Sequence, residues 1–364
     1  MRAVRVILVG LGARSRIWRQ VLDADPRTKI VGLVERDPAT LAAAVTDRAG
    51  AAGGTSIAEV AARVQADAVI LVTPPANRDG QIAEACAAGL AILAEKPLAD
   101  SLAAAERHVA NAARAGVPLM VGLNFRYLAV TQAMKRLWAD DLLGQPAFGR
   151  FLYERWRDGT QAHLNRYPLT MDQPMLLEQS IHHFDLMRHV YDAEPLAIAA
   201  RTWNPPWSMY RGDANVAALI TFERGIEVTY QGTWAGNRNH LGFDWRTDCA
   251  HGIAVQADMF GALSFTRRDD PGMTPVALPE TEIWRDDAAA LLADFVAHLL
   301  DDAPLSCSGA DHLKSLRMVE ACIRSAATGS TINPASLTSL AEPDGRILPT
   351  RTSSLNVQPE IRKT

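Results

Sequence analysis

The chain has 364 residues, which favours two domains over one, and its 48% hydrophobic content is ordinary for a globular protein with a sizeable core. A formal net charge of −4 offers no basic field to nucleic acid or to an anionic membrane, and no apolar run is long enough to span a membrane. The chain enters a strand without a cleavage signal, and Cys86, Cys249, Cys307 and Cys322 lack metal-ligand spacing, so we expect a cytoplasmic protein with free thiols.

The first segment of the chain predicts a strand, a glycine turn and a helix. Val4–Val9 is an almost unbroken apolar run, as a buried parallel strand requires, and an amphipathic stretch begins at Arg14. Between them, Gly10 permits a tight turn and Gly12 lets the backbone approach a pyrophosphate at the helix N-terminus. Ser15 occupies the third position of this fingerprint. The arrangement predicts a dinucleotide-binding loop.

The second predicted strand supports that interpretation. Residues 29–34 form an apolar run that ends at Glu35, twenty residues beyond Ser15. A carboxylate there can accept hydrogen bonds from the adenosine ribose hydroxyls and would repel a 2′-phosphate, which favours NAD. Arg36 could stack on adenine or tolerate NADP, so NADP stays open.

Strands and helices continue to alternate up to residue 125, as in a doubly wound parallel sheet. Further strands are predicted at 68–72, 91–94 and 118–122. Ligands bind such sheets at the carboxyl ends of the strands, so the turns there should line one crevice. The predicted cofactor contacts are Gly10, Gly12, Ala13, Arg14, Ser15, Glu35, Arg36, Thr73, Pro74, Asn77, Glu95, Lys96 and Asn124.

Beyond residue 126 the pattern changes to an α+β domain with an open-faced, mostly antiparallel sheet, predicted over residues 126–332. Helices are expected at 128–138, 175–191, 288–300 and 311–327, and the last of these could pack back on the first domain. Residues 333–364 are rich in Ser, Thr, Pro and charge and are predicted to form a tail or arm. Because an open apolar sheet face needs a cover, we expect a homodimer or homotetramer.

Lys96 is the first candidate catalytic residue. It lies between Glu95 and Pro97 at the end of a predicted strand, and the proline fixes the exit of the chain. An ammonium group aimed into the crevice could stabilise a developing alkoxide. The alternative is a surface lysine that closes a loop.

The second candidate group is on the helix predicted at 175–191. Glu178, His182 and Asp185 share one face of that helix, so a carboxylate could orient the imidazole, raise its pKa or help it grip a diol. His182 then suits a general base, whereas His183 points elsewhere and is expected to be structural. A metal site that also used His189 would need ligands spread too far along one helix, so no metal is expected.

Other residues could contact a polyhydroxylated substrate, because aromatic faces and bidentate donors suit such a ligand. For these residues a place in the core or at the domain interface is about as good an explanation. The predicted substrate contacts are Lys96, Arg126, Tyr127, Trp156, Arg157, Glu178 and His182, with Asp158 a further candidate.

Four motifs in order, GLGARS, TPPAN, AEKPLA and LLEQSIHHFD, resemble the Gfo/Idh/MocA oxidoreductase family over residues 4–332. The resemblance implies a Rossmann domain, an open-faced second domain and NAD(P)-linked oxidation or reduction of sugars and polyols. It also implies that Lys96 contacts nicotinamide and substrate and that His182 is catalytic. Three residues depart from the family pattern: Glu178 replaces the usual Asp, Ser180 a common Gly, and Arg78 a frequent His.

Three hypotheses follow for the function. The first is an NAD(P)-dependent dehydrogenase or reductase acting on a CH–OH group of a sugar, cyclitol or related polyol, with Lys96 and His182 as the catalytic pair. The second is a redox-neutral enzyme that oxidises its substrate only transiently, as in glycoside cleavage. The third is a non-catalytic NAD-binding regulatory protein.

Overall fold

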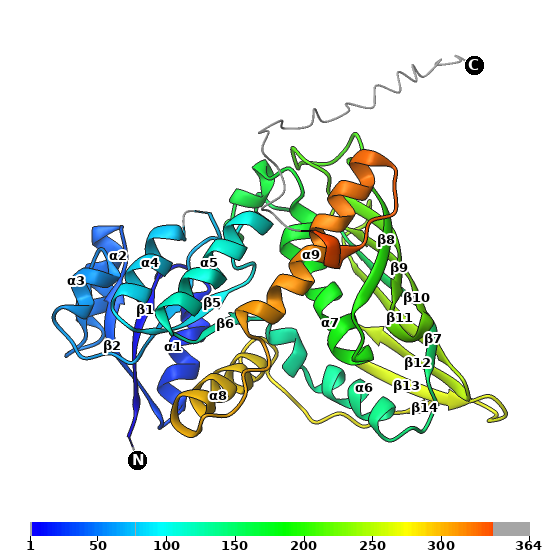
Figure 1. The fold of residues 1–364 in the computed structure, drawn as a ribbon, viewed down its shortest axis with the longest axis horizontal. Coiled ribbons are helices and arrows are strands. Elements are labelled where there is room, and N and C mark those ends of the chain that lie inside the picture. Colours follow the sequence, from blue (N-terminus) through cyan, green and yellow to red (C-terminus); the bar gives the residue numbers. More distant parts are fainter. Residues whose placement is uncertain (1, 77, 338–364) are drawn as a thin grey trace.

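The computed structural model describes residues 2–76 and 78–337, and it has two units side by side (Figure 1). The first unit is a six-stranded parallel sheet in the order β3-β2-β1-β4-β5-β6. This order reverses between β1 and β4, which is where doubly wound sheets bind dinucleotides. Its strands are β1 (Val4–Val9), β2 (Thr28–Val34), β3 (Ala52–Gly54), β4 (Ala68–Leu71), β5 (Ala91–Glu95) and β6 (Leu119–Gly122).

Three helices of the first unit begin at a residue whose side chain caps them. Asp37, Ser56 and Ser101 each accept a hydrogen bond from the backbone N–H three residues ahead, which stabilises a helix N-terminus. The short strand β3 carries two glycines and gave no strand signal in the sequence. The helices are α1 (Ser15–Ala24), α2 (Pro38–Thr46), α3 (Ile57–Ala61), α4 (Asp79–Ala87) and α5 (Leu102–Ala115).

The second unit is built on an eight-stranded sheet in the order β14-β13-β12-β11-β7-β10-β9-β8. Its pairs are antiparallel except that of β7 with β10, which is parallel, so the predicted mostly antiparallel sheet is confirmed. Short turns connect β9 to β10 and β11 to β12, and each of these pairs is antiparallel. The strands are β7 (Pro146–Arg155), β8 (Pro195–Trp203), β9 (Asn215–Phe222), β10 (Ile226–Thr233), β11 (Leu241–Cys249), β12 (Gly252–Asp258), β13 (Gly261–Arg267) and β14 (Thr274–Pro275).

Helices cover one face of this sheet and join it to the first unit. The π-helical segment η3 (Leu176–Ser180) runs directly into α7 (Ile181–Tyr191), and α9 (Gly309–Thr328) lies beside α7. Helix α9 also packs against α5, where Arg317 donates to Glu106 at 3.0 Å. Helix α6 (Ala129–Ala139) borders α7, and α8 (Asp286–Asp301) packs against α1 (Figure 1).

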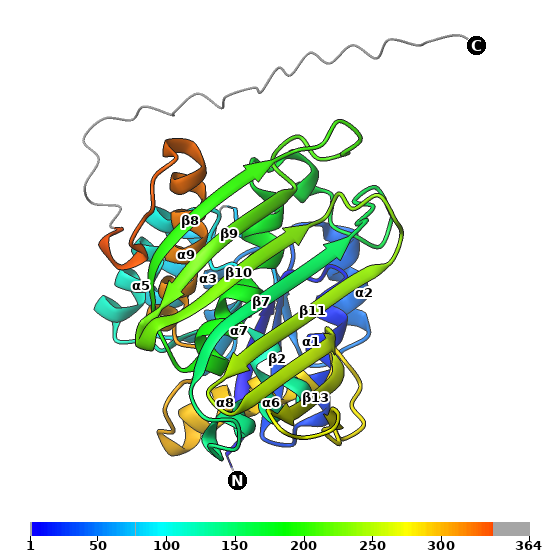
Figure 2. The same ribbon diagram turned by 90° about the vertical axis from the view of Figure 1, so that its right-hand side faces the viewer.

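The far face of the sheet is open in Figure 2, and it differs from the apolar face expected there. Along β10, the apolar side chains of Ile226, Val228 and Tyr230 are buried on the helix side, whereas Glu227, Thr229 and Gln231 face outward. The open face also carries an ion pair between Arg150 and Asp244 at 2.8 Å, beside exposed Phe148 and Leu219. It is therefore mixed in polarity, because the alternation sends the apolar set inward.

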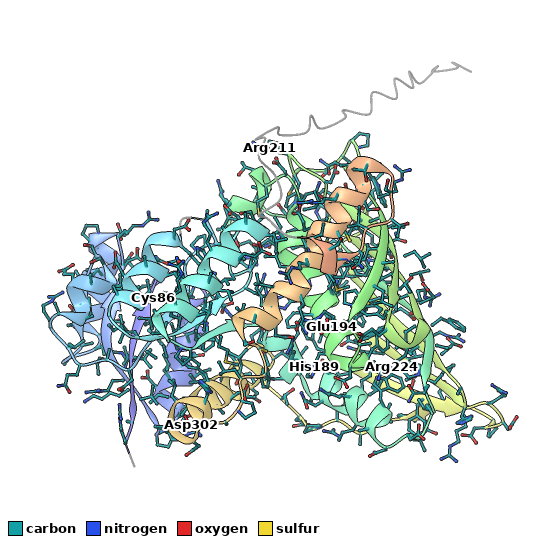
Figure 3. The ribbon with its side chains drawn as sticks, viewed as in Figure 1. Cys86, His189, Glu194, Arg211, Arg224 and Asp302 are labelled. Atoms are coloured by element: carbon teal, nitrogen blue, oxygen red, sulfur yellow. The ribbon has the colours of Figure 1, made fainter. Side chains whose placement is uncertain are left out.

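Side chains fill the interior of both units, as Figure 3 shows. Cys86 lies in α4 in the first unit, and all four cysteines are free thiols, as predicted. No helix among residues 2–76 and 78–337 is long and apolar enough to cross a membrane.

Candidate active site

Lys96 and the η3 segment meet where the two units face each other. The Nζ atom of Lys96 donates to the backbone carbonyl oxygen of Glu178 at 2.7 Å and to its carboxylate Oε2 at 3.3 Å. The Lys96 side chain is only 15% exposed, so it is largely covered and differs from the surface lysine considered as the alternative. Two segments 82 residues apart thus converge on one point.

The helix predicted at 175–191 exists, but its first turns are wider than an α-helix. The five residues of η3 adopt π-helical geometry, which is rare and frequent at functional sites. Within it, Gln179 contacts the Nε2 atom of His183 at 3.0 Å, and the Nδ1 atom of His183 contacts the Tyr230 hydroxyl at 2.9 Å. His183 is fully buried and both of its ring nitrogens have partners, as a structural histidine would be.

His182 is held by an aromatic stack. Its ring lies on that of Phe125 with centroids 4.0 Å apart and planes 18° apart, and its side chain is buried. Burial, reinforced by the nearby Lys96 ammonium, keeps the pKa of His182 well below its ordinary value, so the expectation that a carboxylate could raise this pKa is wrong. The imidazole is therefore neutral at pH 7 and has a lone pair available to accept a proton.

Two polar atoms in this site have no partner among the described residues: Nδ1 of His182 and Oε1 of Glu178, both buried. Buried polar atoms are normally hydrogen-bonded, so a pair of orphans one helical turn apart marks a place prepared for a ligand group. Glu178 itself bonds to Lys96 and makes no hydrogen bond to His182. The predicted carboxylate–imidazole pairing is replaced by a carboxylate–ammonium pairing.

Tyr167 borders this site, although the sequence gave no reason to select it. Burial and the charge of the Glu178 carboxylate raise the pKa of its hydroxyl, so it stays protonated. Arg157, a predicted substrate contact, is close enough to act on the same hydroxyl. The Arg157 guanidinium lies 4.3 Å from the centre of the Trp234 ring and donates to the Tyr210 hydroxyl at 3.2 Å.

The neighbours of Arg157 are placed less favourably for a substrate contact. Trp156 pairs through its backbone with Ala235 at the end of the sheet. The Asp158 carboxylate accepts two hydrogen bonds from Thr160, so it stabilises its own turn.

The glycine loop has the shape that a bound dinucleotide needs. Gly10 has φ +86°, and a Cβ there would lie 2.9 Å from a methyl group of Thr73, so only glycine fits. A Cβ at Gly12 would meet no atom within 4 Å, so that backbone is bare and open. Glu35 holds the loop by accepting from the N–H of Leu11 at 2.8 Å. These residues fit NAD, with Gly12 and Ala13 toward the pyrophosphate and Glu35 toward a ribose.

Some of the remaining predicted cofactor residues are exposed near the glycine loop, and others form hydrogen bonds that hold it. Ala13, Arg36 and Pro74 are exposed near the loop, while the Thr73 hydroxyl donates to Gln81 at 2.7 Å.

Glu95 accepts from Arg14 at 2.6 Å and from the indole of Trp18 at 2.7 Å. Burial would raise the Glu95 pKa, but Arg14 outweighs it, so this buried pair fixes the loop. The buried Ser15 hydroxyl donates to the Gly12 carbonyl at 2.7 Å, and Asn77 lies outside the described residues.

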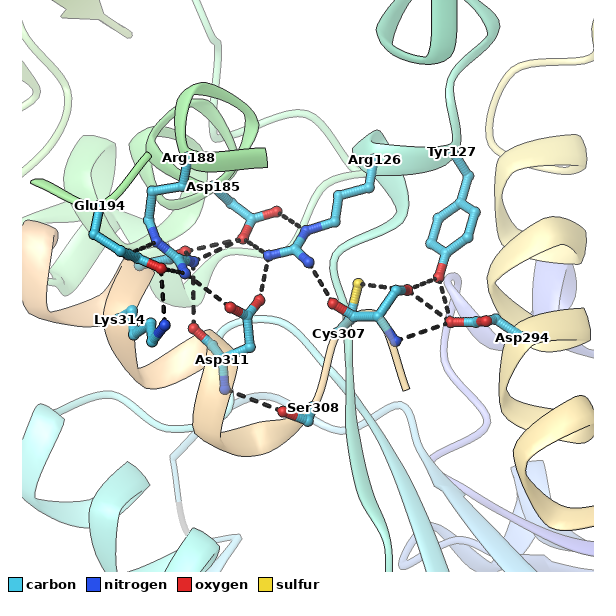
Figure 4. A network of polar contacts seen from close by, with 12 residues as sticks. Arg126, Tyr127, Asp185, Arg188, Glu194, Asp294, Cys307, Ser308, Asp311 and Lys314 are labelled. Carbon is cyan, nitrogen blue, oxygen red and sulfur yellow. Dashed lines mark hydrogen bonds and ion pairs between the residues drawn. The ribbon is translucent and has the colours of Figure 1, made fainter. Parts of the chain in front are cut away.

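Three predicted contacts bond at the interface between the units, which is the alternative considered for Arg126 and Tyr127. The Asn124 amide donates to the buried Asp287, and the Tyr127 hydroxyl donates to Asp294 at 2.8 Å. Arg126 is buried, and its guanidinium is shared by Asp185, Asp311 and the carbonyl of Ser306 (Figure 4). These side chains follow β6, but acids and carbonyls from distant segments engage them.

Asp185 is likewise drawn away from Glu178 and His182. It accepts from Arg126 at 2.7 Å and from the Ser315 hydroxyl at 2.9 Å. In the part of the chain that the structure describes, no group of three or more His, Cys, Asp or Glu side chains could hold a metal ion.

An aromatic cluster continues from His182 through residues that the sequence analysis missed. The Phe125 ring lies 5.6 Å from that of Trp284 and 6.1 Å from that of Phe260. Trp284 precedes α8, has φ +76° and is 43% exposed. A bulky residue in the left-handed region is strained, and such strain collects at functional sites. No local pattern in the sequence could have joined these three positions.

Comparison with known proteins places this geometry in a family. Residues 4–123 match an oxidoreductase family with an NAD-binding Rossmann fold, and residues 131–254 match the GFO/IDH/MocA C-terminal domain. A D-apiose dehydrogenase from Paraburkholderia graminis is 29% identical over 353 residues, which cover 91% of this chain and 89% of that protein. An inositol 2-dehydrogenase from Rhizobium meliloti is 25% identical over 337 residues, covering 89% and 97%.

Solved structures share the same architecture. An oxidoreductase from Agrobacterium radiobacter, in complex with NAD+, L-tartaric acid and magnesium, superposes with a TM-score of 0.84 at 21% identity. The match covers 92% of this chain and 99% of that one. Together with the two family matches, this confirms the predicted fold class, and the chain belongs to the Gfo/Idh/MocA family of NAD-binding oxidoreductases.

Proposed function

We propose that this protein is an NAD-dependent dehydrogenase that oxidises a hydroxyl-bearing carbon of a sugar, cyclitol or related polyol, or reduces the corresponding carbonyl. The supporting observation is the meeting of the Lys96 ammonium with a turn that carries two unpartnered buried atoms, on Glu178 and His182. The relatives named D-apiose dehydrogenase and inositol 2-dehydrogenase act on substrates of this kind.

Each residue has a distinct role in the proposed reaction. Neutral His182 accepts the hydroxyl proton, while Lys96 donates a hydrogen bond to the same oxygen and stabilises its developing negative charge. Bound NAD supplies the acceptor for the hydride that leaves the carbon. Glu178 holds Lys96 in position and leaves Oε1 free for a second substrate hydroxyl. An imidazole with a low pKa returns its proton readily, so the pair also suits carbonyl reduction.

Glu35 supports the choice of NAD over NADP. Its carboxylate is already held at the glycine loop, where it would face the 2′-position of the adenosine ribose and repel a phosphate there. Exposed Arg36 beside it is the feature that would let NADP bind.

We further propose that the open sheet face contacts a second copy of the chain in a cytoplasmic homodimer or homotetramer. Exposed Phe148 and Leu219, flanked by the Arg150–Asp244 pair, provide both apolar area and charges that a symmetric partner can match. A monomer in light scattering at micromolar concentration would contradict this.

The function is tested by incubating the purified protein with NAD or NADP and a panel of sugars, cyclitols and polyols, and recording absorbance at the NADH band. Turnover with at least one polyol, faster with NAD than with NADP, is the expected result. Turnover without added cofactor, with NAD that co-purifies, would show the redox-neutral alternative. NAD binding without turnover of any substrate would favour a regulatory protein.

A further inference from the structure

Arg78 is a buried cation that bonds only to backbone carbonyls. Its side chain is 1% exposed, and Nη1 donates to the carbonyls of Pro97 at 2.8 Å and Leu98 at 3.3 Å, as well as to that of Glu95. Nη2 donates to the carbonyl of Thr73. Among the described residues, no carboxylate lies within ion-pair distance of this guanidinium.

A buried charge without a counterion is costly, so its location is informative. Burial lowers the pKa of Arg78 to about 10, although the charges of Glu95 and Glu178 oppose the shift. The guanidinium is still protonated at neutral pH. Other buried arginines of this protein, such as Arg126 and Arg188, each contact at least two carboxylates. Hydrogen bonds to backbone carbonyls, and not an ion pair, must therefore offset the free energy of desolvating the Arg78 guanidinium.

The carbonyls that Arg78 binds lie on both sides of Lys96. Fixing those of Glu95 and Pro97 leaves the intervening residue little backbone freedom, so the Lys96 side chain starts from a defined point. The neighbouring N–H of Leu98 donates to Nε2 of buried His312 at 3.3 Å, which holds the loop from the other side. The same guanidinium reaches the loop after β4, where Thr73 packs beneath Gly10.

One side chain therefore joins the loop after β4 to the loop after β5. A planar fork with five donors can bridge two loops at once, which an ammonium or an imidazole cannot do. Building on the function proposed above, we propose that Arg78 is a positioning residue that locks the Lys96 loop to the Thr73 loop and so sets Lys96 on Glu178 and Gly10 toward NAD.

The test compares Arg78→Met and Arg78→Lys with Arg107→Met as a matched control. Arg107 is an exposed arginine whose ion pair with Asp79, the next residue after Arg78, leaves the two loops untouched. We expect Arg78→Met to lower kcat by about 100-fold and Arg78→Lys by about 10-fold, since an ammonium can hold only part of the fork's bonds. Millimolar methylguanidinium should restore at least 10-fold of the Arg78→Met loss by refilling the cavity. Arg107→Met should stay within 2-fold of the parent.

Two readouts do not depend on turnover. NAD affinity of each variant, from quenching of tryptophan fluorescence, should fall about 10-fold in Arg78→Met. Acetylation of Lys96 by acetic anhydride, followed by mass spectrometry, should be faster than in the parent because Lys96 is freed from Glu178. Unchanged NAD affinity and unchanged Lys96 labelling, with only a lower Tm, would overturn the proposal.

The outcomes separate this proposal from the proposed function. If the parent oxidises no polyol but Arg78→Met still loosens Lys96 and weakens NAD binding, the positioning role stands and the dehydrogenase assignment fails. If Arg78→Met does not fold, Arg78→Lys supplies the same comparisons, and labelling, affinity and kcat equal to those of the parent would overturn the role.

Discussion

One continuous helix carries two buried polar clusters of opposite character. In the first, Glu178 and His182 keep two polar atoms without partners. In the second, one to two turns later, Asp185 and Arg188 belong to a network with Arg126 that leaves no buried nitrogen or oxygen of these three residues unpaired (Figure 4). The two clusters differ in whether every buried polar atom has a hydrogen-bond partner, and this difference separates a structural cluster from a ligand site. The complete cluster holds the two units together, and the incomplete cluster is open to a ligand.

The two adjacent histidines give the largest expected difference. His182→Asn should lower kcat by about 10²- to 10⁴-fold, because the proton acceptor is lost, with little change in the free energy of unfolding. His183→Asn breaks the bonds to Gln179 and Tyr230 and should lower the free energy of unfolding by about 1–3 kcal/mol, with kcat of the folded protein within a few-fold. Steady-state kinetics and urea unfolding measure both. Similar kinetic losses in the two variants would contradict the separation of roles.

Mutation of the Arg126 network should lower the free energy of unfolding and leave kcat of the folded protein nearly unchanged. Arg126→Met leaves Asp185 as a buried, partly unpaired carboxylate and should lower the free energy of unfolding by about 3–5 kcal/mol. The control is Arg150→Met, which removes an exposed ion pair on the open sheet face and should cost less than about 1 kcal/mol. Chemical denaturation at pH 7.5 provides the measurement.

A loss of kcat without a loss of stability in Arg126→Met would reverse this interpretation. It would return Arg126 to the substrate site, where the sequence first placed it as one of two alternatives.

Lowering the pH should produce the smallest of the expected effects, a modest decrease in the free energy of unfolding caused by buried histidines. Burial lowers the pKa of His312 to about 4 and that of His183 to about 3. The unfolded chain binds protons on these side chains below about pH 6.5, while the folded chain does not, so stability falls as the pH drops from 6.5 toward 4. The loss should be about 1 kcal/mol for each histidine between pH 7.5 and 5.5. Urea unfolding at the two pH values checks it.

His182 should not act as a pH sensor near neutral pH. Because its pKa stays well below the usual range, the rate of alcohol oxidation should show no inflection near pH 6.5 that depends on it. An inflection there that vanishes in His182→Asn would contradict a buried, neutral imidazole.

The sequence predicted the parts of this molecule that depend on local patterns. The strands at 4–9 and 91–94, the glycine loop and the helix at 175–191 all follow from apolar runs, glycines and helical spacing, and the structure places them within about one residue. The convergence of Lys96 with the turn of His182 was expected from the family resemblance and is supported by the bond to Glu178.

Features that depend on distant partners were not predictable. Arg126 lies in the turn that follows β6, and nothing local shows that Asp311 will engage it from a helix 185 residues later. Trp284 joins the cluster around Phe125 only through the path of a long loop. The π geometry of η3 was also missed, because its residues have ordinary helical spacing and none of the five is glycine or proline.

The π-helical geometry of η3 has a consequence for how such a protein can diverge. A wide turn accommodates one residue beyond the α-helical repeat, so everything before it is rotated relative to everything after it by about 100° per residue. Deletion of one residue from this turn would leave Asp185 and Arg188 in their present contacts between the units, but it would turn a different pair of side chains toward Lys96. The residues that face the ligand can thus change while the packing of the helix stays the same.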